Sequence, residues 1–452
     1  MGLIVSRILS TDKGKYYLEV DGKPSLYNSV QTWYPPDGEF APYVENTAKL
    51  NYKIFSFWLY WKMLEPKKGE YDFNVLDRVI DLAEENDIRL DIVWGGSMFC
   101  DHLDSRWVPE WIYNNSDYRV KDENGNDIFV DGCDMGDVPA VDPCNMEVYE
   151  QEKAMLIALI AHLKEYDKTH RVIMIQVENE INLNHYMGGK ENVLSYVNRL
   201  CGVIAEQDYK IATRVNIACY EMDPDIDALS NVLAQGVDNY SANVGIIRQS
   251  MLDPNCTKMK YVAENAAYFN TTSLMTAAFA AGGFYNIYRL DFDEYYRKPG
   301  LYNAGWELTP VALKVKNLNA ALGKCSELVA KAHRDDMLDF NNEISTSPYS
   351  DYRETKFLGD IKIGMATRDS SAVGLVIKDG DDYYCLADDD AYFLVYNKEV
   401  SCQAGSFVDG KWICDEEKHT DYWQVNWRTG DYAVSYSAGE LIKITLKNKK
   451  EN

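Results

Sequence analysis

Short apolar segments alternate with longer segments of helical period between about residue 25 and residue 330. Residues 54–60, Ile-Phe-Ser-Phe-Trp-Leu-Tyr, predict a buried strand, and apolar positions three and four apart at 75–83 predict the helix that follows it. The same alternation recurs along the chain. Eight strands are expected in all, near residues 25–30, 54–60, 90–94, 172–177, 211–218, 232–239, 259–263 and 284–290.

Repeated units of strand then helix predict a parallel sheet, because parallel neighbours need a long crossover between them. Eight such units fit an α/β fold in which the sheet closes into a (β/α)8 TIM barrel. An open doubly wound sheet would place a glycine-rich phosphate turn after its first strand, and residues 33–38, Trp-Tyr-Pro-Pro-Asp-Gly, lack one. We therefore expect a catalytic barrel over residues 1–333, with its last helix at 311–333. The long segment at 99–145 follows the third strand, on the barrel face where loops build sites.

The pattern changes towards the C-terminus. Residues 382–386 and 391–396 have the composition and alternation of short strands. The turn pairs Asp379-Gly380 and Asp409-Gly410 separate such segments. Residues 334–452 are therefore predicted to form a C-terminal antiparallel β domain of the sandwich type.

The chain is strongly acidic, which bears on its partners. Its 452 residues include 46 Lys and Arg against 71 Asp and Glu, for a net charge of −25. Such a field repels phosphate backbones and anionic lipids, so neither nucleic acid nor a membrane surface is expected as a partner. No segment approaches the roughly 18 apolar residues of a membrane-spanning helix. A neutral or cationic substrate fits the charge better.

The cysteine and histidine patterns predict neither a metal nor a cofactor. The ten cysteines contain no Cys-x-x-Cys pair, and the six histidines contain no His-Glu-x-x-His motif. Four aspartates on the insertion lack the spacing of a calcium loop. Residues 1–22 lack a signal-peptide pattern, so we expect reduced thiols and a cytoplasmic protein. The four aspartates are Asp131, Asp134, Asp137 and Asp142.

Two glutamates stand at the ends of predicted strands. Glu180 follows the fourth strand and Glu264 follows the seventh. About three strand–helix units separate them, and functional side chains collect at the carboxyl ends of barrel strands. We therefore expect the two carboxylates to face each other across the barrel mouth. Such a pair performs retaining glycoside hydrolysis, with one carboxylate as nucleophile and the other as general acid and base. The simpler interpretation is that each glutamate caps a helix or pairs with an arginine.

The motifs around these strands resemble those of known enzymes. Residues 61–73 resemble the W-x-x-x-E-P-x-x-G-x-Y-D-F segment of the β-galactosidases in glycoside hydrolase families 35 and 42, which belong to clan GH-A. Residues 172–180 are similar to the strand that carries the proton donor of those families. Residues 407–412 resemble the closing β domain, of unknown function, in a family 35-like branch. The resemblance implies the barrel fold and the retaining chemistry.

The same resemblance implies roles for individual residues. Glu180 is then the proton donor and Glu264 the nucleophile. Glu178 and Asn179 would contact sugar hydroxyls. Tyr240 lies near the end of the sixth strand, where clan members place a tyrosine against the nucleophile; the alternative is a core tyrosine.

Further side chains are candidates for sugar binding. Several tryptophans offer an aromatic face on which a sugar ring stacks, although tryptophans are as common in barrel cores. Asp101 and His102 offer groups that bind hydroxyls, or else belong to a solvated loop. The tryptophans are Trp58, Trp94, Trp107 and Trp111.

The sugar itself is left open, because the chain departs from the family 35 pattern after its third strand. Residues 95–102 stand where that family has a Gly-Pro-Tyr-Ile-Cys-x-Glu-Trp stretch, which grips the galactose 4- and 6-hydroxyls. We expect a retaining exo-β-glycosidase acting on an oligosaccharide or β-glycoside, with β-galactosidase as the leading activity. The alternatives are a β-glucosidase, a transglycosylase on short β-glycans and, from another class, a sugar-binding barrel without turnover. Association into a homo-oligomer stays open.

Overall fold

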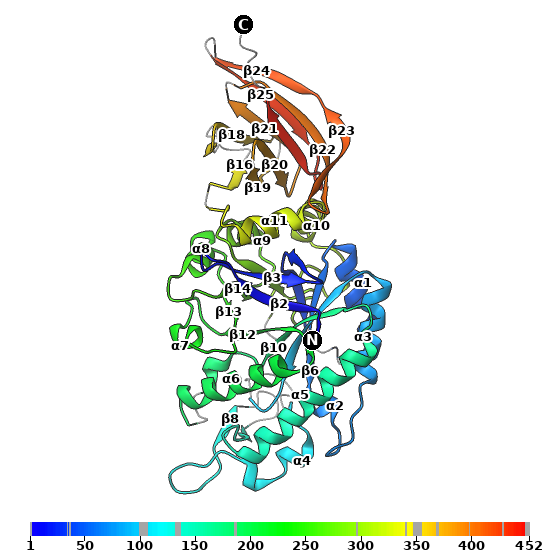
Figure 1. Cartoon of the computed structure of the whole chain (residues 1–452), viewed down its shortest axis with the longest axis vertical. Coiled ribbons are helices and arrows are strands. Elements are labelled where there is room, and N and C mark those ends of the chain that lie inside the picture. The colour runs from blue at the N-terminus through cyan, green and yellow to red at the C-terminus, as the bar shows by residue number, and fades with distance from the viewer. Residues whose placement is uncertain are drawn as a thin grey trace.

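The computed structural model has a barrel of parallel strands at one end and antiparallel sheets at the other (Figure 1). No helix in the residues it describes is long and apolar enough to cross a membrane. The described residues are 2–33, 35, 38–98, 107–131, 137–184, 188–294, 297–339, 341–346, 355–367, 370–396, 398–426 and 429–447.

Eight parallel strands close into a barrel, as predicted. The last and first strands complete the closure, with Tyr285 opposite Asn28. Nearly all of the strand residues are buried, because helices cover the outside of the barrel and side chains fill its interior. In chain order the strands are β5 (Asn28–Thr32), β6 (Ile54–Tyr60), β7 (Arg89–Gly95), β10 (Val172–Val177), β12 (Ala212–Ile217), β13 (Ala234–Asp238), β14 (Met259–Glu264) and β15 (Phe284–Tyr288).

Helices follow the strands and surround the barrel (Figure 1). The longest, α5, begins where Asn145 caps it by accepting from the backbone N–H groups of Glu147 and Val148. The single helix expected at 311–333 is wrong, because the chain forms two helices that are separated at Lys324 and Cys325. The helices are α1 (Ala41–Lys49), α2 (Trp61–Leu64), α3 (Asn74–Glu85), α4 (Glu110–Tyr113), α5 (Met146–Tyr166), α6 (Lys190–Glu206), α7 (Pro224–Asp227), α8 (Val244–Leu252), α9 (Thr271–Ala280), α10 (Pro310–Gly323) and α11 (Ser326–Arg334).

A small antiparallel sheet that the sequence pattern did not indicate precedes the barrel. Its strands are β2 (Ser6–Ser10), β3 (Tyr16–Val20) and β4 (Lys23–Ser25). Because β4 occupies the start of the expected first barrel strand, β5 begins only at Asn28.

Ser6 joins this sheet to the barrel. Its hydroxyl donates to the carbonyl group of Ile173 at 2.5 Å and accepts from the backbone N–H of Ala212 at 2.9 Å. Both partners lie at the beginning of barrel strands, so the small sheet lies at the amino-terminal end of the barrel and leaves the opposite end to the site.

The C-terminal part consists of two antiparallel sheets, as predicted. One contains, in spatial order, β16 (Glu343–Thr346), β19 (Ala372–Asp379), β20 (Asp382–Ala387), β26 (Ile442–Leu446), β22 (Val400–Val408) and β23 (Lys411–Lys418). The other contains β17 (Thr355–Leu358), β18 (Ile361–Ala366), β21 (Ala391–Tyr396), β25 (Thr429–Tyr436) and β24 (Thr420–Asn426).

The apolar core continues from the barrel into the β sheets. Leu375 of β19 and Leu386 of β20 belong to the same buried cluster as Leu318 and Leu322 of α10. The expected division after residue 333 stays a prediction: α11 ends at Arg334 and β16 begins nine residues later, but the packing does not stop there.

A buried ion pair lies inside the barrel, below the site. Arg214 of β12 donates from Nε and Nη2 to Oδ2 of Asp91, at 3.0 and 2.6 Å, and both side chains are almost completely buried. Arg214 also donates to the side chain of Gln176 on β10. Gln176 in turn donates to Asn179 at 2.9 Å, so the charged interior supports the turn that carries Glu180.

Candidate active site

Glu180 and Glu264 lie at the same end of the barrel. Glu264 is the last residue of β14, and Glu180 follows the last residue of β10 by three positions. Both side chains are largely buried, since Glu180 is 8% and Glu264 7% exposed. A third carboxylate, Asp238, ends β13 and stands opposite Glu264 in the strand register. The barrel therefore gathers three carboxyl groups at its carboxyl-terminal end.

Two neutral donors hold Glu264. Gln31 of β5 donates from Nε2 to Oε1 at 2.9 Å, and the Tyr240 hydroxyl donates to Oε2 at 2.5 Å. Asn286 of β15 fixes Gln31 by donating to its side-chain oxygen at 2.9 Å. Burial and the nearby Glu264 raise the pKa of Tyr240, so its hydroxyl keeps the proton that it donates. Donors on both oxygens favour the ionised carboxylate.

A strained turn orients Glu180. The backbone φ angles are 60° at Glu178 and 45° at Glu180, in the left-handed region that residues other than glycine rarely adopt. The backbone N–H of Glu180 donates to Oδ1 of Asn216 at 3.0 Å, and Asn179 donates to Oε2 of Glu180 at 3.4 Å. Asn216 also donates to Asn179 at 2.8 Å. Hydrogen bonds from the fourth and fifth strands thus hold this turn, as strain at a functional site requires.

Asp238 was not among the candidates drawn from the sequence. Asn216 donates from Nδ2 to both of its oxygens, at 3.1 and 3.0 Å. The Asp238 side chain is 4% exposed and also hydrogen-bonds Glu180. Burial, and after it the charges of Glu264 and Glu180, raises the pKa of Asp238 well above its ordinary value.

The polar residues that sequence reasoning missed share one signal. Each is a polar side chain in the last three positions of a barrel strand, where the side chains of a barrel site collect. They are Gln31 of β5, Asn216 of β12, Asp238 of β13 and Asn286 of β15.

A series of aromatic rings leads away from Tyr240. Tyr288 meets Tyr240 edge-on with ring centroids 6.2 Å apart, and it meets Trp33 edge-on at 6.3 Å. Trp33 stacks on Trp58, with centroids 5.0 Å apart and 5° between the planes. Trp58 has no exposed surface, whereas Trp33 is only partly buried. Trp33, which the sequence analysis did not select, is therefore the accessible ring, and Trp58 packs behind it.

Glu178 and Trp94 belong to a buried network beside the site. The carboxylate of Glu178 accepts from the backbone N–H groups of Gly96 and Met98, both at 3.2 Å. Trp94 donates to Glu152 of α5 at 2.9 Å. Burial and the neighbouring Glu152 raise the pKa of Glu178. Contact of Glu178 or Trp94 with a sugar stays a prediction, and their complete burial speaks against it.

Of the other candidates, Trp107 is buried, Trp111 is partly buried, and two lie outside the described residues. Trp107 is buried beside Trp58, with ring centroids 5.0 Å apart. Trp111 donates to the carbonyl group of Glu65 at 3.3 Å. Asp101, like His102 beside it, lies outside the described residues. Within the ranges that the structure covers, no three His, Cys, Asp or Glu side chains are grouped to hold a metal ion.

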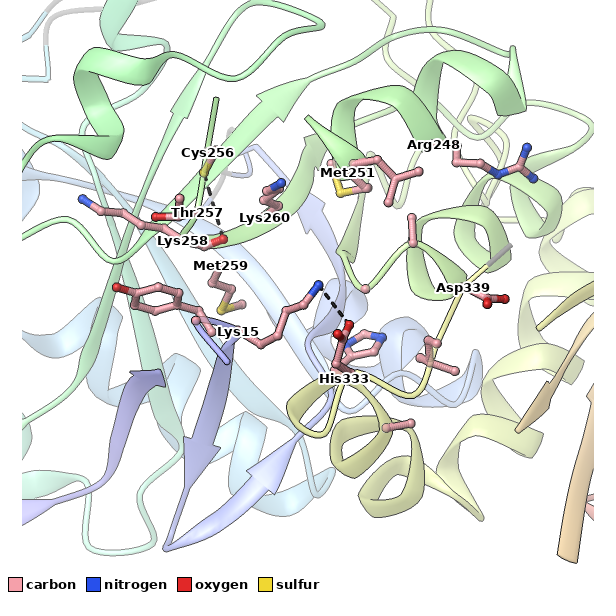
Figure 2. A pocket seen from close by; sticks show the side chains of 18 residues that line it. Lys15, Arg248, Met251, Cys256, Thr257, Lys258, Met259, Lys260, His333 and Asp339 are labelled. Carbon is pink, nitrogen blue, oxygen red and sulfur yellow. Dashed lines mark hydrogen bonds and ion pairs between the residues drawn. The ribbon is translucent and has the colours of Figure 1, made fainter. Parts of the chain in front are cut away.

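A separate cavity of about 430 Å³ lies at the opposite end of β14, where Met259 begins the strand (Figure 2). Four cationic side chains line it, but the protein itself engages them. Lys15 pairs with Asp336 at 3.0 Å, and Lys260 donates to the carbonyl group of Asp253 at 2.5 Å. The other two are bound in the same way by carbonyl or carboxylate groups. The candidate active site is therefore the carboxyl-terminal end of the barrel, where the three carboxyl groups described above lie together.

Comparison of the sequence supports this location. Residues 44–195 match the model of glycoside hydrolase family 42, which is described as beta-galactosidase. This range begins in α1, ends in α6 and includes Glu180. The chain thus carries a domain similar to that family of glycoside hydrolases. No curated protein matches the chain significantly in sequence.

Solved structures share the fold at low sequence identity. A beta-galactosidase from the psychrophilic Marinomonas ef1 matches with a TM-score of 0.50 and 10% identity, over 68% of this chain and 62% of that protein. A family 39 glycoside hydrolase from the gut symbiont Bacteroides cellulosilyticus WH2 matches with a TM-score of 0.50 and 12% identity, over 96% of this chain and 84% of the other. The second alignment extends over nearly the whole chain, so the barrel and the C-terminal sheets occur together there.

The exo-beta-1,4-mannosidase Op5Man5 from Opitutaceae bacterium strain TAV5 matches with a TM-score of 0.49 and 13% identity, over 71% of this chain and 63% of that protein. The chain therefore spans less than two thirds of the length of the mannosidase and of the Marinomonas protein.

Proposed function

We propose that the chain is a retaining exo-β-glycosidase in which Glu264 is the nucleophile and Glu180 the general acid and base. The observation that carries the proposal is the pair of hydrogen bonds from Gln31 and Tyr240 to Glu264, which favour an ionised carboxylate at the end of β14. A second glutamate, Glu180, lies at the same barrel end in a turn held by Asn216. The similarity of residues 44–195 to family 42 adds support.

The two glutamates would act in two steps. In the first, the Glu264 carboxylate attacks the anomeric carbon while Glu180 gives its proton to the leaving oxygen, and a glycosyl ester forms. In the second, Glu180 takes a proton from water, whose oxygen attacks the same carbon and releases Glu264. Two inversions leave the anomeric configuration unchanged. A sugar hydroxyl in place of water would give transglycosylation by the same steps.

β-Galactosides are the leading substrates, since residues 44–195 match a family described as beta-galactosidase. β-Glucosides are the next candidates. Trp33 is connected to Glu264 through the rings of Tyr288 and Tyr240. Its partly exposed face suits the apolar side of a pyranose. We also propose that the chain belongs to clan GH-A and that its C-terminal sheets resemble those of a family 35-like branch. We further propose that the protein acts in the cytoplasm. The eight described cysteines are free, which suits a reducing compartment.

A panel of nitrophenyl β-glycosides that differ at the 2, 4 and 6 positions tests the activity. We expect the highest kcat/KM for the galactoside and a burst of nitrophenol from an accumulating glycosyl ester. Glu264→Ala should abolish turnover, and azide should restore it as the inverted glycosyl azide. Glu399→Ala is the control, because Glu399 is an exposed glutamate in the C-terminal sheets that pairs with Lys447. Sugar binding without turnover in the wild type would instead identify a sugar-binding barrel.

A further inference from the structure

Asp238 lies close to both proposed catalytic carboxylates. It stands opposite Glu264 in the register of β13 and β14, and its side chain hydrogen-bonds Glu180. Asn216 ties the group together, because it donates to both oxygens of Asp238 and accepts from the backbone N–H of Glu180. Asp238 is only 4% exposed, so its carboxyl group is surrounded by these residues and not by solvent.

The titratable groups that face Asp238 come from its own strand and from its neighbours. Glu180 follows β10, Glu264 ends β14, and Tyr240 follows β13 itself. Burial raises the pKa of Tyr261 of β14, and the charge of Asp238 adds to this effect. Both tyrosines have raised pKa values and stay neutral. Two cations lie near this group: Arg214 donates to Tyr261 at 3.1 Å but is paired with the buried Asp91, and Lys298 lies over the ring of Tyr240 with Nζ 3.5 Å from its centroid.

Two ionised carboxylates cannot hydrogen-bond each other, because both offer only acceptors, so the contact between Asp238 and Glu180 requires a proton. We propose that Asp238 shares one proton with Glu180 and is a positioning residue that keeps Glu180 a strong base in the second half of the reaction. This inference rests on the proposed function. The raised pKa of Asp238, caused by burial and then by Glu264 and Glu180, agrees with it.

Asp238 acts on Glu180 most when Glu264 is esterified. In a site with two carboxylates, the charge of the nucleophile raises the pKa of the acid, and that charge disappears when the glycosyl ester forms. The acid then becomes a weaker base at the moment when water must be deprotonated. Asp238 is not consumed, so its charge still acts on Glu180 after Glu264 is esterified.

In the free enzyme Glu264 is ionised, and Glu180 and Asp238 hold one proton between them. In the first step this proton goes to the leaving oxygen as the glycosidic bond breaks and the ester bond to Glu264 forms, which leaves Glu180 and Asp238 both ionised. In the second step water gives its proton to the pair, its oxygen bonds to the anomeric carbon, and the ester electron pair returns to Glu264. The total charge of the three carboxyl groups is the same before and after the first step.

Asp238→Asn is the test, because the amide keeps the size of the side chain and removes the shared proton and the charge. We expect the alkaline limb of kcat/KM against pH to move down by about one pH unit or more, since Glu180 loses a negative neighbour. With a dinitrophenyl glycoside, whose departure needs no proton, kcat should fall about tenfold and KM should fall with it, because deglycosylation slows and the ester accumulates. Azide, which needs no base, should relieve this slow step.

Asp388→Asn is the matched control. Asp388 is also a buried carboxylate with a raised pKa, but it accepts from Thr272 at 2.6 Å and from the backbone of Val373, at the junction with the C-terminal sheets. We expect it to alter stability without moving the pH limb or the burst. An Asp238→Asn enzyme that folds and shows the wild-type limb, kcat and KM overturns the proposal.

A second measurement uses the wild-type enzyme, in case Asp238→Asn does not fold. A 2-deoxy-2-fluoro glycosyl fluoride esterifies Glu264 and releases fluoride, which needs no proton, so Glu180 and Asp238 keep theirs. The infrared difference spectrum between the trapped and the free enzyme at pH 7 cancels the constant absorbance of other buried carboxyl groups, and it should show no loss of a protonated carboxyl band, which is recognised by its shift in deuterium oxide. Loss of that band on trapping overturns the proposal. Absence of turnover with every β-glycoside in the wild type would instead remove the proposed function, so the two failures are distinguishable.

Discussion

The hydroxyl group of Tyr240, which follows β13, donates across 2.5 Å to Oε2 of Glu264, the last residue of the adjacent strand β14. A hydrogen bond to a carboxylate is worth about 1.5–3 kcal/mol. Removing the donor in Tyr240→Phe should therefore lower kcat/KM about 10- to 100-fold. The pKa of Glu264 should rise as well, so the acid limb of the pH profile should move to higher pH.

Tyr285→Phe is the control for this prediction. Tyr285 is a fully buried tyrosine of β15 whose hydroxyl has no hydrogen-bond partner among the described residues. Its removal should leave both pH limbs in place. Equal effects of the two substitutions would show that Tyr240 acts through packing rather than through its hydrogen bond.

Glu180→Ala should separate substrates by their leaving groups. Aglycones with a high pKa need the proton, so their kcat/KM should fall by a factor of about 100 to 10,000, whereas dinitrophenyl glycosides should keep most of theirs in the first step. The measurement is a plot of log kcat/KM against leaving-group pKa for both enzymes. A parallel displacement of the two lines would contradict the role of Glu180 as acid.

Trp33 and Trp58 should respond differently, although they stack on each other. Trp33→Ala removes the accessible ring and should raise KM about threefold to tenfold, the effect of one lost aromatic contact of about 0.5–1.5 kcal/mol. Trp58→Ala removes a fully buried ring and should lower the free energy of unfolding by about 3–5 kcal/mol. Enzyme kinetics and denaturant unfolding of both variants check this. Unchanged KM in a folded Trp33→Ala enzyme would place the sugar elsewhere.

Asp91→Asn should destabilise the barrel strongly. It leaves the buried charge of Arg214 without its partner, which costs about 3–5 kcal/mol. Asp87→Asn is the control, because Asp87 is 76% exposed where it pairs with Lys53 and its loss should cost about 1 kcal/mol or less. Urea unfolding of both variants measures the difference, and similar losses would mean that the interior pair is better hydrated than its burial indicates.

His333 makes stability depend on pH. It is buried, and burial lowers its pKa to about 4, against about 6.5 in the unfolded chain. Between these values the unfolded chain binds more protons, so the contribution of His333 to stability is complete above pH 6.5 and is lost as the pH falls through 4. This loss amounts to about 3 kcal/mol. In His333→Gln that part of the pH dependence should disappear.

His419→Gln is the control for the pH series, since His419 is 87% exposed beside Asp421. The measured quantity is the free energy of unfolding between pH 4 and pH 7. The gap between the wild type and His333→Gln should narrow as the pH falls. A gap that stays constant over this range would show that His333 is not neutral in the folded protein.

Local sequence patterns predicted the barrel because several of its strands, such as β6 and β10, are buried on both faces and are almost continuously apolar. The positions of Glu180 and Glu264 at strand ends followed from the same patterns. Contacts across the barrel did not. Gln31 and Glu264 lie 233 residues apart, and only closure of the sheet brings them together. Nothing local distinguishes Gln31 from any other polar residue near a strand end.

Burial of individual side chains was equally beyond the sequence. Trp58 and Trp33 are both aromatic residues at strand ends, but the order in which they stack decides which of them a ligand reaches. The helix expected at 311–333 divides at Lys324 because the chain turns there, although the apolar spacing continues on both sides. The sequence pattern shows where apolar side chains recur, but it does not show which residues cover each of them.

The continuous core between α10 and strands β19 and β20 limits how the chain can be shortened. A truncation after Arg334 would expose the side chains of Leu318 and Leu322 to water, and the shortened protein would tend to aggregate. The sheets beyond the barrel thus act as its outer wall on that side. A fusion protein that uses this barrel should therefore include the C-terminal sheets as well.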